Sequence, residues 1–340
     1  MKEIEKCFVS IIVPCRDEKK YIVKCLDSII AQDYPKDNLE ILVVDGGSTD
    51  GTKEIVKEYI QKYPFMKLLN NPRRAVPIAL NIGIKEVKGE VIMRMDAHNA
   101  YEKNYIPKCI KYLKKYDVDN VGGICVTSPG ANTILARSIA LTLSHPFGVG
   151  NSYFRIGSKE PRFVDTVPFG CYKREVFERV GLFNENLVRN QDIEFNLRLK
   201  KAGGKILLVP DITSYYHARS TLKAFARQNF WNGFWVIYST KFTKIPFSIR
   251  HLVPFFLVVF LMGSLILLFF FHPFIYLFTF IFGSYFILNV FFSARLSFKD
   301  GLKYLPTLIL SFSTLHFSYG FGSILGVIKL IVSKKKRKKA

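Results

Sequence analysis

The feature that constrains this chain most is a long apolar segment near its C-terminal end. From Leu252 to Ala294 the sequence contains no Asp, Glu, Lys or Arg, and it breaks at His272-Pro273 into two parts, 252–271 and 274–294. About 20 residues at roughly 1.5 Å each match a hydrocarbon core of about 30 Å. A soluble helix has no reason to run so far without a charge, so we predict two membrane-spanning helices.

A third charge-free stretch, 304–328, is more polar because it contains serines, glycines and His316. The chain then ends in a basic run, 334–340, and basic tails prefer the cytosol. A cytosolic N-terminal region and two spans would return the chain to the cytosol, and a third span would export the tail. We therefore favour a re-entrant or interfacial segment at 304–328, with a third span as the alternative.

The net charge of +22 predicts a polyanionic partner. Anionic membrane lipids suffice, since each basic residue of the tail can contribute about 1 kcal/mol near such a surface. The sequence has no zinc-finger spacing, RNA-binding aromatic motif or leucine zipper, which argues against nucleic acid as the partner. The six cysteines form no C-x-x-C pair, so we expect neither a disulfide framework nor a structural zinc site. The first apolar run is too short for a secretory signal, so we expect residues 1–240 to be cytosolic.

Strands and helices alternate in the first part of the chain. Apolar, β-branched runs predict strands at 8–13, 39–44, 66–69 and 90–95, and apolar residues at three-to-four spacing predict helices between them. Short connections of this kind are typical of an α/β fold with a doubly wound, mostly parallel sheet. Ligands bind such sheets at the carboxyl ends of the strands. The loops that begin at Pro14, Asp45 and Asp96 all fall there, so we expect them to converge.

Two common phosphate-binding motifs are missing from these loops. Gly46 and Gly51 have P-loop spacing, but Thr52-Lys53 follows instead of Lys and then Ser or Thr, and no strand is followed by G-x-G-x-x-G.

Asp96 and His98 are two residues apart at a strand end, where both side chains can project to one side and share a divalent ion. The pair by itself is also compatible with a capped turn, and the histidine favours Mn²⁺ over Mg²⁺.

Taken in order, four stretches resemble the glycosyltransferases of family 2, and among them the membrane-bound enzymes similar to succinoglycan-type polysaccharide glycosyltransferases. The stretches are Val9-Ser10-Ile11-Ile12-Val13-Pro14-Cys15-Arg16-Asp17-Glu18, Asp45-Gly46-Gly47-Ser48-Thr49-Asp50-Gly51-Thr52, Met95-Asp96-Ala97-His98 and Asn190-Gln191-Asp192-Ile193-Glu194. The resemblance covers about residues 8–235.

This resemblance implies a GT-A domain over 1–240, with a nucleotide-binding half at 8–120 and an acceptor-binding half at 121–240, followed by a membrane region at 241–333. It implies an inverting transfer of a sugar from a nucleoside-diphosphate sugar, with Asp192 as the general base and a divalent cation, Mn²⁺ or Mg²⁺, at Asp96 and His98. The other site residues that it implies are Pro14, Arg16, Glu18, Asp45, Arg74 and Asp96 for the nucleotide sugar, and Gln191, His217, Gln228 and Trp231 for the acceptor or diphosphate.

The chain departs from the family pattern in several places. Gly46 follows Asp45 where many relatives have a second aspartate, His98 replaces the second aspartate of the metal motif, and Gln191 precedes Asp192 where Glu is common. The stretch 227–231 does not match the Gln-x-x-Arg-Trp motif of processive relatives, so we predict transfer of a single sugar.

The whole pattern predicts a multi-pass cell-membrane enzyme with a cytosolic catalytic domain, a donor that is a UDP-sugar, and a lipid-phosphate-linked saccharide as acceptor. The alternatives are a membrane-tethered sugar-nucleotide-binding protein without catalysis and a nucleotidyltransferase. A small transporter is a third, although the predicted spans offer no intramembrane acid for a pathway.

Overall fold

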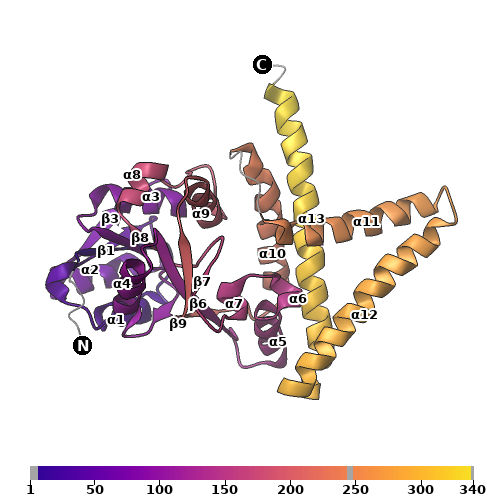
Figure 1. Ribbon diagram of the computed structural model, residues 1–340, viewed down its shortest axis with the longest axis horizontal. Coiled ribbons are helices and arrows are strands. Elements are labelled where there is room, and N and C mark those ends of the chain that lie inside the picture. The colour runs from indigo at the N-terminus through magenta and orange to yellow at the C-terminus, as the bar shows by residue number, and fades with distance from the viewer. Residues whose placement is uncertain (1–6, 243–247, 338–340) are drawn as a thin grey trace. The chain divides into compact units, whose positions relative to one another are not determined.

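The computed structural model describes residues 7–242 and 248–337. The chain divides into two compact units (Figure 1). The first, here called the sheet unit, consists of Met1–Val126 and Gly157–Tyr216. The second, the helical unit, consists of Thr127–Ile156 and His217–Ala340.

Within the described residues, nine strands form one sheet with the order β3-β2-β1-β4-β8-β6-β9-β5, and β7 pairs with β9. The strands are β1 Val9–Cys15, β2 Leu39–Asp45, β3 Met66–Asn70, β4 Val91–Arg94, β5 Ala100–Tyr101, β6 Asn120–Ser128, β7 Arg162–Phe163, β8 Cys171–Lys173 and β9 Ile206–His217. The four strands predicted from the sequence are β1 to β4. They are parallel to one another, with β1 between β2 and β4.

The other half of the sheet is antiparallel, because β8 runs against both β4 and β6, and β9 runs against β5 and β7. A parallel pair needs a long crossover connection, usually a helix. Regular alternation of strands and helices stops after β4, and this explains why the sheet is mixed although the sequence predicted a mostly parallel one.

Several helices of the sheet unit pack apolar residues into its core. The helices of this unit are α1 Ile22–Ile30, α2 Thr52–Lys62, α3 Val76–Glu86, α4 Tyr105–Lys115, α8 Glu175–Val180 and α9 Gln191–Lys201, and one 3₁₀ turn, η1, spans Lys36–Asn38. In α1 the buried residues are Ile22, Cys25, Leu26 and Ile29, which recur at helical spacing. They join the core of buried strand residues, which includes Val9, Ile11 and Val13.

Gly83 brings α3 close to β1. A Cβ atom added at Gly83 would lie 2.6 Å from Cγ2 of Ile12, which is closer than carbon atoms can approach. We expect Gly83→Ala to destabilise the protein by about 1–3 kcal/mol, because overpacking a dense core moves backbone or side chains. Thermal unfolding of the detergent-solubilised chain measures this. Lys85→Ala on the same helix should change stability by less than about 0.5 kcal/mol, and equal melting temperatures for Gly83→Ala and wild type would contradict the prediction.

The helical unit contains the apolar C-terminal part of the chain. Its elements are α5 Ile134–Leu143, α6 Pro146–Val149, α7 Tyr153–Ile156, α10 Leu222–Tyr238, η2 Ser239–Lys241, η3 Ile249–His251, α11 Val253–Leu268, α12 Phe274–Asp300, η4 Leu302–Tyr304 and α13 Leu305–Arg337. Three stretches of the described residues are long and apolar enough to cross a membrane: Ile249–Leu268, Phe274–Asp300 and Leu302–Ser333. They contain the three apolar segments found in the sequence, apart from residues 269–271.

A re-entrant turn within 304–328 does not match the structure, because α13 is one helix without a break (Figure 1). The interfacial form and the third span both fit an unbroken helix and stay predictions. Two of the polar side chains that suggested the re-entrant form contact α12, whereas Ser311 and Ser318 donate to carbonyls within α13. The amide of Asn289 on α12 donates to Oγ of Ser313 at 2.9 Å, and Nδ1 of His316 lies 3.1 Å from the hydroxyl of Tyr285. Polar groups that pair between helices are compatible with a helix at membrane depth.

The boundary expected at residue 240 does not coincide with the division in the structure, since α5 to α7 and α10 lie in the helical unit. Glycines allow α10 and α13 to pack backbone against backbone. A Cβ added at Gly233 would lie 2.0 Å from the carbonyl oxygen of Tyr319, and one at Gly322 would overlap the carbonyl of Phe230. Because of this close approach, α10 packs against α13 although α10 has charged residues near its start. Of the basic tail, 334–337 continue α13 as backbone, and 338–340 lie outside the described residues.

Candidate active site

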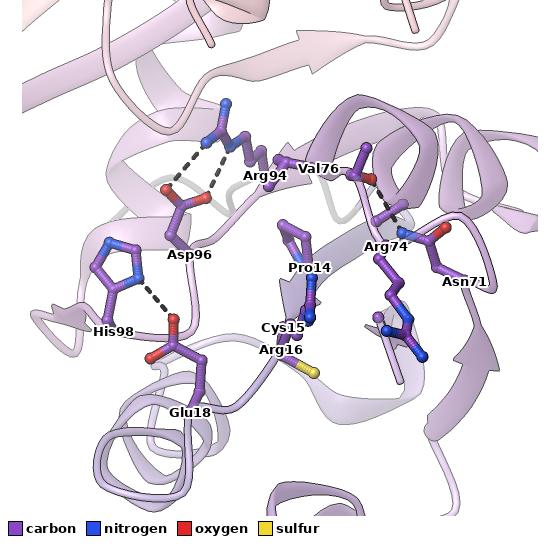
Figure 2. Close-up of a pocket in the computed structure, with 13 residues that line it drawn as sticks. Pro14, Cys15, Arg16, Glu18, Asn71, Arg74, Val76, Arg94, Asp96 and His98 are labelled. Atoms are coloured by element: carbon purple, nitrogen blue, oxygen red, sulfur yellow. Dashed lines mark hydrogen bonds and ion pairs between the residues drawn. The ribbon is translucent and has the colours of Figure 1, made fainter. Parts of the chain in front are cut away.

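A cavity of about 220 Å³ lies at the carboxyl ends of the parallel strands (Figure 2). It is lined by Pro14, Cys15, Arg16, Glu18, Gly46, Asn71, Arg74, Ala75, Val76, Ala79, Arg94, Asp96 and His98. Six of the residues predicted from the sequence are therefore brought together, namely Pro14, Arg16, Glu18, Arg74, Asp96 and His98. They come from the ends of β1 and β4 and from the loop before α3, which matches the place where ligands bind in parallel sheets.

The loops after β1 and β2 hold each other in place. The backbone N–H of Asp17 donates to Oγ of Ser48 at 2.9 Å, and that of Glu18 donates to Oγ1 of Thr52 at 2.8 Å. In return, the N–H of Thr49 donates to Oδ1 of Asp17 at 2.9 Å. These bonds explain why hydroxyl residues are needed in the second loop, since they fix the backbone that presents Glu18 to the cavity.

Asp45, predicted to bind the nucleoside, supports this loop and does not line the cavity. Its side chain is buried and accepts hydrogen bonds from the backbone of Gly47 at 3.1 Å and from the hydroxyl of Ser48 at 2.5 Å. The neighbouring Gly46 is the lining residue here, and a Cβ at that position would lie 3.2 Å from Cβ of Arg16. The side chain missing from Gly46 thus leaves room for that arginine.

The loop between β3 and α3 contributes Asn71 and Arg74. The N–H of Asn71 donates to the carbonyl of Asp45 at 2.8 Å, and its side-chain amide donates to the carbonyl of Ala75 at 3.0 Å. Arg74 has a φ of 60°, a conformation that is uncommon for residues other than glycine. Strained backbone of this kind is often kept where a side chain must point in a particular direction.

Asp96 is held by Arg94, as Figure 2 shows. Nε of Arg94 lies 2.8 Å from Oδ1 and Nη2 lies 3.0 Å from Oδ2, so both carboxylate oxygens are engaged. Burial raises the pKa of Asp96, but the guanidinium of Arg94 outweighs this and holds the pKa below its usual value. The carboxylate is therefore ionised at neutral pH.

Sequence reasoning missed Arg94, although a signal was present. Residues two apart on a strand end project to the same side, which is the reason for pairing Asp96 with His98. The same reason applies to Arg94, which precedes Asp96 by two residues at the end of β4. Also missed were lining residues without charge: Cys15, Gly46, Asn71, Ala75, Val76 and Ala79.

His98 is paired with Glu18. Nδ1 of the ring lies 3.3 Å from Oε1 of the carboxylate, and the two side chains are 43% and 21% exposed. Burial lowers the pKa of His98, but the hydrogen bond to Glu18 and the charge of Asp96 outweigh it and raise the pKa above its usual value. Among residues 7–242 and 248–337, no three His, Cys, Asp or Glu side chains are placed to hold a metal ion together.

Asp192 lies in the first turn of α9, and Gln191 beside it is buried. Neither residue lines the cavity, but the charge of Asp192 acts on Arg94. Burial lowers the pKa of Arg94, and the carboxylates of Asp96 and Asp192 raise it above its usual value. Arg94 thus makes contact with one predicted site aspartate and lies in the electric field of the other.

An ion pair between the buried Glu194 and the partly buried Arg198 helps to fix the helix that carries Asp192. Nε of Arg198 lies 2.8 Å from Oε1 of Glu194, and Nη2 donates to the carbonyl of Leu182 at 2.8 Å. The same guanidinium also donates to the carbonyl of Val180. These bonds join α9 to the last residue of α8 and to the loop that follows it.

His217, Gln228 and Trp231, predicted for the acceptor side, belong to the helical unit. His217 ends β9, and the other two lie on α10. Trp231 is 37% exposed, and its ring centroid lies 5.3 Å from that of Phe234. Their role at the acceptor or diphosphate stays a prediction.

Comparison with known proteins identifies the class. The fold is that of GT-A glycosyltransferases: a mannosyltransferase from Pyrobaculum calidifontis superimposes with a TM-score of 0.64 at 19% identity, over 95% of this chain and 87% of that one. Residues 10–181 match the model of glycosyl transferase family 2. The chain therefore belongs to family 2 of the glycosyltransferases and is a glycosyltransferase enzyme.

Two curated relatives are similar to this chain over about two thirds or more of their own length. A dolichyl N-acetyl-alpha-D-glucosaminyl phosphate 3-beta-D-2,3-diacetamido-2,3-dideoxy-beta-D-glucuronosyltransferase of Methanococcus voltae is 35% identical over 256 residues, 73% of this chain and 78% of its own length. The succinoglycan biosynthesis protein ExoA of Rhizobium meliloti is 27% identical over 225 residues, 66% of this chain and 67% of its own. The resemblance stated from the sequence motifs is confirmed.

Proposed function

We propose that this enzyme transfers one sugar, with inversion, from a nucleoside-diphosphate sugar to a lipid-phosphate-linked saccharide at the cytosolic face of the cell membrane. The observation that carries the proposal is the composition of the cavity. Arg16 and Arg74 on its wall suit a diphosphate, while Asp96 and His98 offer ligands for a cation. Arg94 connects this cavity electrostatically to Asp192.

The residues present fit a divalent cation that takes most of its ligands from the substrate. Asp96 offers carboxylate oxygens and His98 a ring nitrogen, and both line the cavity. A donor set of one carboxylate and one imidazole suits Mn²⁺ better than Mg²⁺. The mannosyltransferase that shares the fold was solved with GDP-mannose and Mn²⁺. When bound, such a cation would stabilise the negative charge of the departing diphosphate.

The proposed chemistry is a single displacement. A hydroxyl oxygen of the acceptor forms a bond to the anomeric carbon of the donor, the bond from that carbon to the diphosphate oxygen breaks, and the configuration inverts. Asp192 accepts the hydroxyl proton, and as a general base it contributes roughly 10²- to 10⁴-fold to the rate. Arg16 and Arg74 hold the diphosphate so that it can leave with its negative charge paired.

The acceptor class is supported by the anchor and by one relative. The name of the Methanococcus voltae protein describes transfer to a sugar that is joined through phosphate to dolichol. Three apolar helices would keep the enzyme at the bilayer, where an acceptor of this kind is confined. Such tethering raises the effective concentration of the acceptor around the enzyme.

Binding and turnover of the detergent-solubilised chain test the proposal together. We expect UDP or GDP, with Mn²⁺, to raise the melting temperature, because a ligand at about 100 times its Kd stabilises by about 2.7 kcal/mol. The corresponding nucleotide sugar should then release nucleoside diphosphate when a polyprenyl-phosphate saccharide is added.

The same measurements separate the alternatives. Binding without transfer to any acceptor in a broad panel would indicate a sugar-nucleotide-binding protein. Release of pyrophosphate from a nucleoside triphosphate and a sugar phosphate would indicate a nucleotidyltransferase. Either result would overturn the proposed reaction.

A further inference from the structure

The contact between Arg94 and Asp96 lies on the wall of the cavity and is largely shielded from water. The side chains are 14% and 15% exposed, and the guanidinium binds both carboxylate oxygens. Asp96 is the carboxylate best placed to hold a cation, yet a positive charge already neutralises it. A cation that binds Asp96 must therefore come close to Arg94.

The other charges around the cavity add to this effect. Arg16 and Arg74 also line it, and the second acid, Glu18, is paired with His98. A divalent cation that enters alone meets three guanidinium groups and two carboxylates that already have partners, and of these guanidinium groups Arg16 lies 3.6 Å from the carboxylate of Asp17. Repulsion between like charges is strong in a partly enclosed site, where the effective dielectric constant is well below that of water.

We propose that Arg94 is a counter-ion that weakens binding of a free divalent cation to Asp96 and thereby makes the cavity take up the cation and the diphosphate together. This inference rests on the proposed function, because the diphosphate supplies the negative charge that offsets the repulsion. Arg94 does not bind the cation itself. It is a positioning residue that acts on the cation through its contact with Asp96. Nothing in its contact with Asp96 needs a change of protonation.

In the wild-type protein, binding of the cation and binding of the nucleotide should be coupled. If the nucleoside diphosphate tightens Mn²⁺ binding by some factor, then Mn²⁺ must tighten nucleotide binding by the same factor. We expect this coupling to be large in the wild type, at least about tenfold. Removing the positive charge of Arg94 should strengthen binding of Mn²⁺ alone and so reduce the coupling.

The experiment measures Mn²⁺ binding by the electron paramagnetic resonance signal of the free aqueous ion. The full chain in detergent is titrated with Mn²⁺ in the absence of nucleotide, and then with saturating UDP or GDP. Arg94→Gln removes the charge but keeps an amide that can donate to Asp96, whereas Arg94→Lys keeps the charge. Arg74→Met is the matched control, because it removes one positive charge from the same cavity without a contact to Asp96.

We expect Arg94→Gln to bind Mn²⁺ alone about tenfold more tightly than the wild type, as removal of a nearby like charge predicts. Arg94→Lys should stay close to the wild type, and Arg74→Met should weaken nucleotide binding more than it changes binding of Mn²⁺ alone. A folded Arg94→Gln protein with unchanged or weaker Mn²⁺ binding would overturn the proposal. So would equal tightening in the glutamine and lysine variants, since charge would then not be the cause.

The wild type decides the matter even if Arg94→Gln does not fold. Mn²⁺ binding that is equally tight with and without nucleotide overturns the inference while the proposed function stands. If wild-type protein binds neither UDP nor GDP at any Mn²⁺ concentration, the proposed function fails, and the inference fails with it.

Discussion

Asp192→Asn should lower kcat by about 100- to 10,000-fold and leave nucleotide binding nearly unchanged, because an amide cannot accept the proton that a general base removes. The substitution keeps the size of the side chain and one oxygen, so the contact with the backbone N–H of Ile193 at 3.0 Å can persist. The α9 helix is anchored elsewhere, by Arg198 and Glu194, so we expect the fold to remain intact.

Steady-state transfer and nucleotide titration measure the two halves of this prediction. Asp37→Asn is a suitable control, since it removes the same charge from an exposed position in η1 and should leave kcat unchanged. Transfer by Asp192→Asn at the wild-type rate would show that another group takes the proton. A loss of nucleotide binding would instead mean that Asp192 serves the donor and not the acceptor.

Asp96→Asn should abolish the effect of Mn²⁺ on nucleotide binding and should also destabilise the protein. An amide neither neutralises Arg94 nor binds a cation as a carboxylate does. Removing one partner of a buried ion pair leaves an unpaired charge, which costs up to about 3–5 kcal/mol. The pair is 14% and 15% exposed, so we expect a cost toward the lower end.

A double-mutant cycle separates these two effects. Arg94→Gln combined with Asp96→Asn should recover part of the lost stability, because no buried charge is then left without a partner. The same double variant should not recover Mn²⁺-dependent nucleotide binding. Chelation of Mn²⁺ should lower nucleotide affinity in the wild type and have no effect in Asp96→Asn. Stability losses that simply add would show that the two side chains do not interact.

Much of the fold follows from local patterns in the sequence. The strands around Ile11, Val43 and Met93 were predicted within one or two residues, since runs of buried β-branched and apolar residues need no partner to be recognised. The apolar helices were found because a bilayer requires about 20 apolar residues in a row. The polar positions of α13 led to the wrong prediction of a re-entrant turn, because the partners of Ser313 and His316 lie on α12, and no local pattern reports that.

The candidate site was predicted in part. Pro14, Arg16, Glu18 and Asp96 follow strand ends, and the edge where parallel strands end is a general consequence of the fold. The engagement of Asp45 by its own loop could not be predicted, because it depends on how Ser48 turns back. The contact between Arg94 and Asp96 was within reach, since both lie on one side of the strand end.

Spacing between near neighbours in the chain is enough to establish an α/β part, apolar helices and acidic loops at strand ends. It does not establish which carboxylates are already paired or where the division between the units falls, and these features came from the packed molecule. Glu18 contacts His98, and Gly233 lies against Tyr319, although several helices or strands separate the two residues of each pair along the chain. Such contacts arise when distant segments pack, and their free energy depends on the burial and geometry that packing creates.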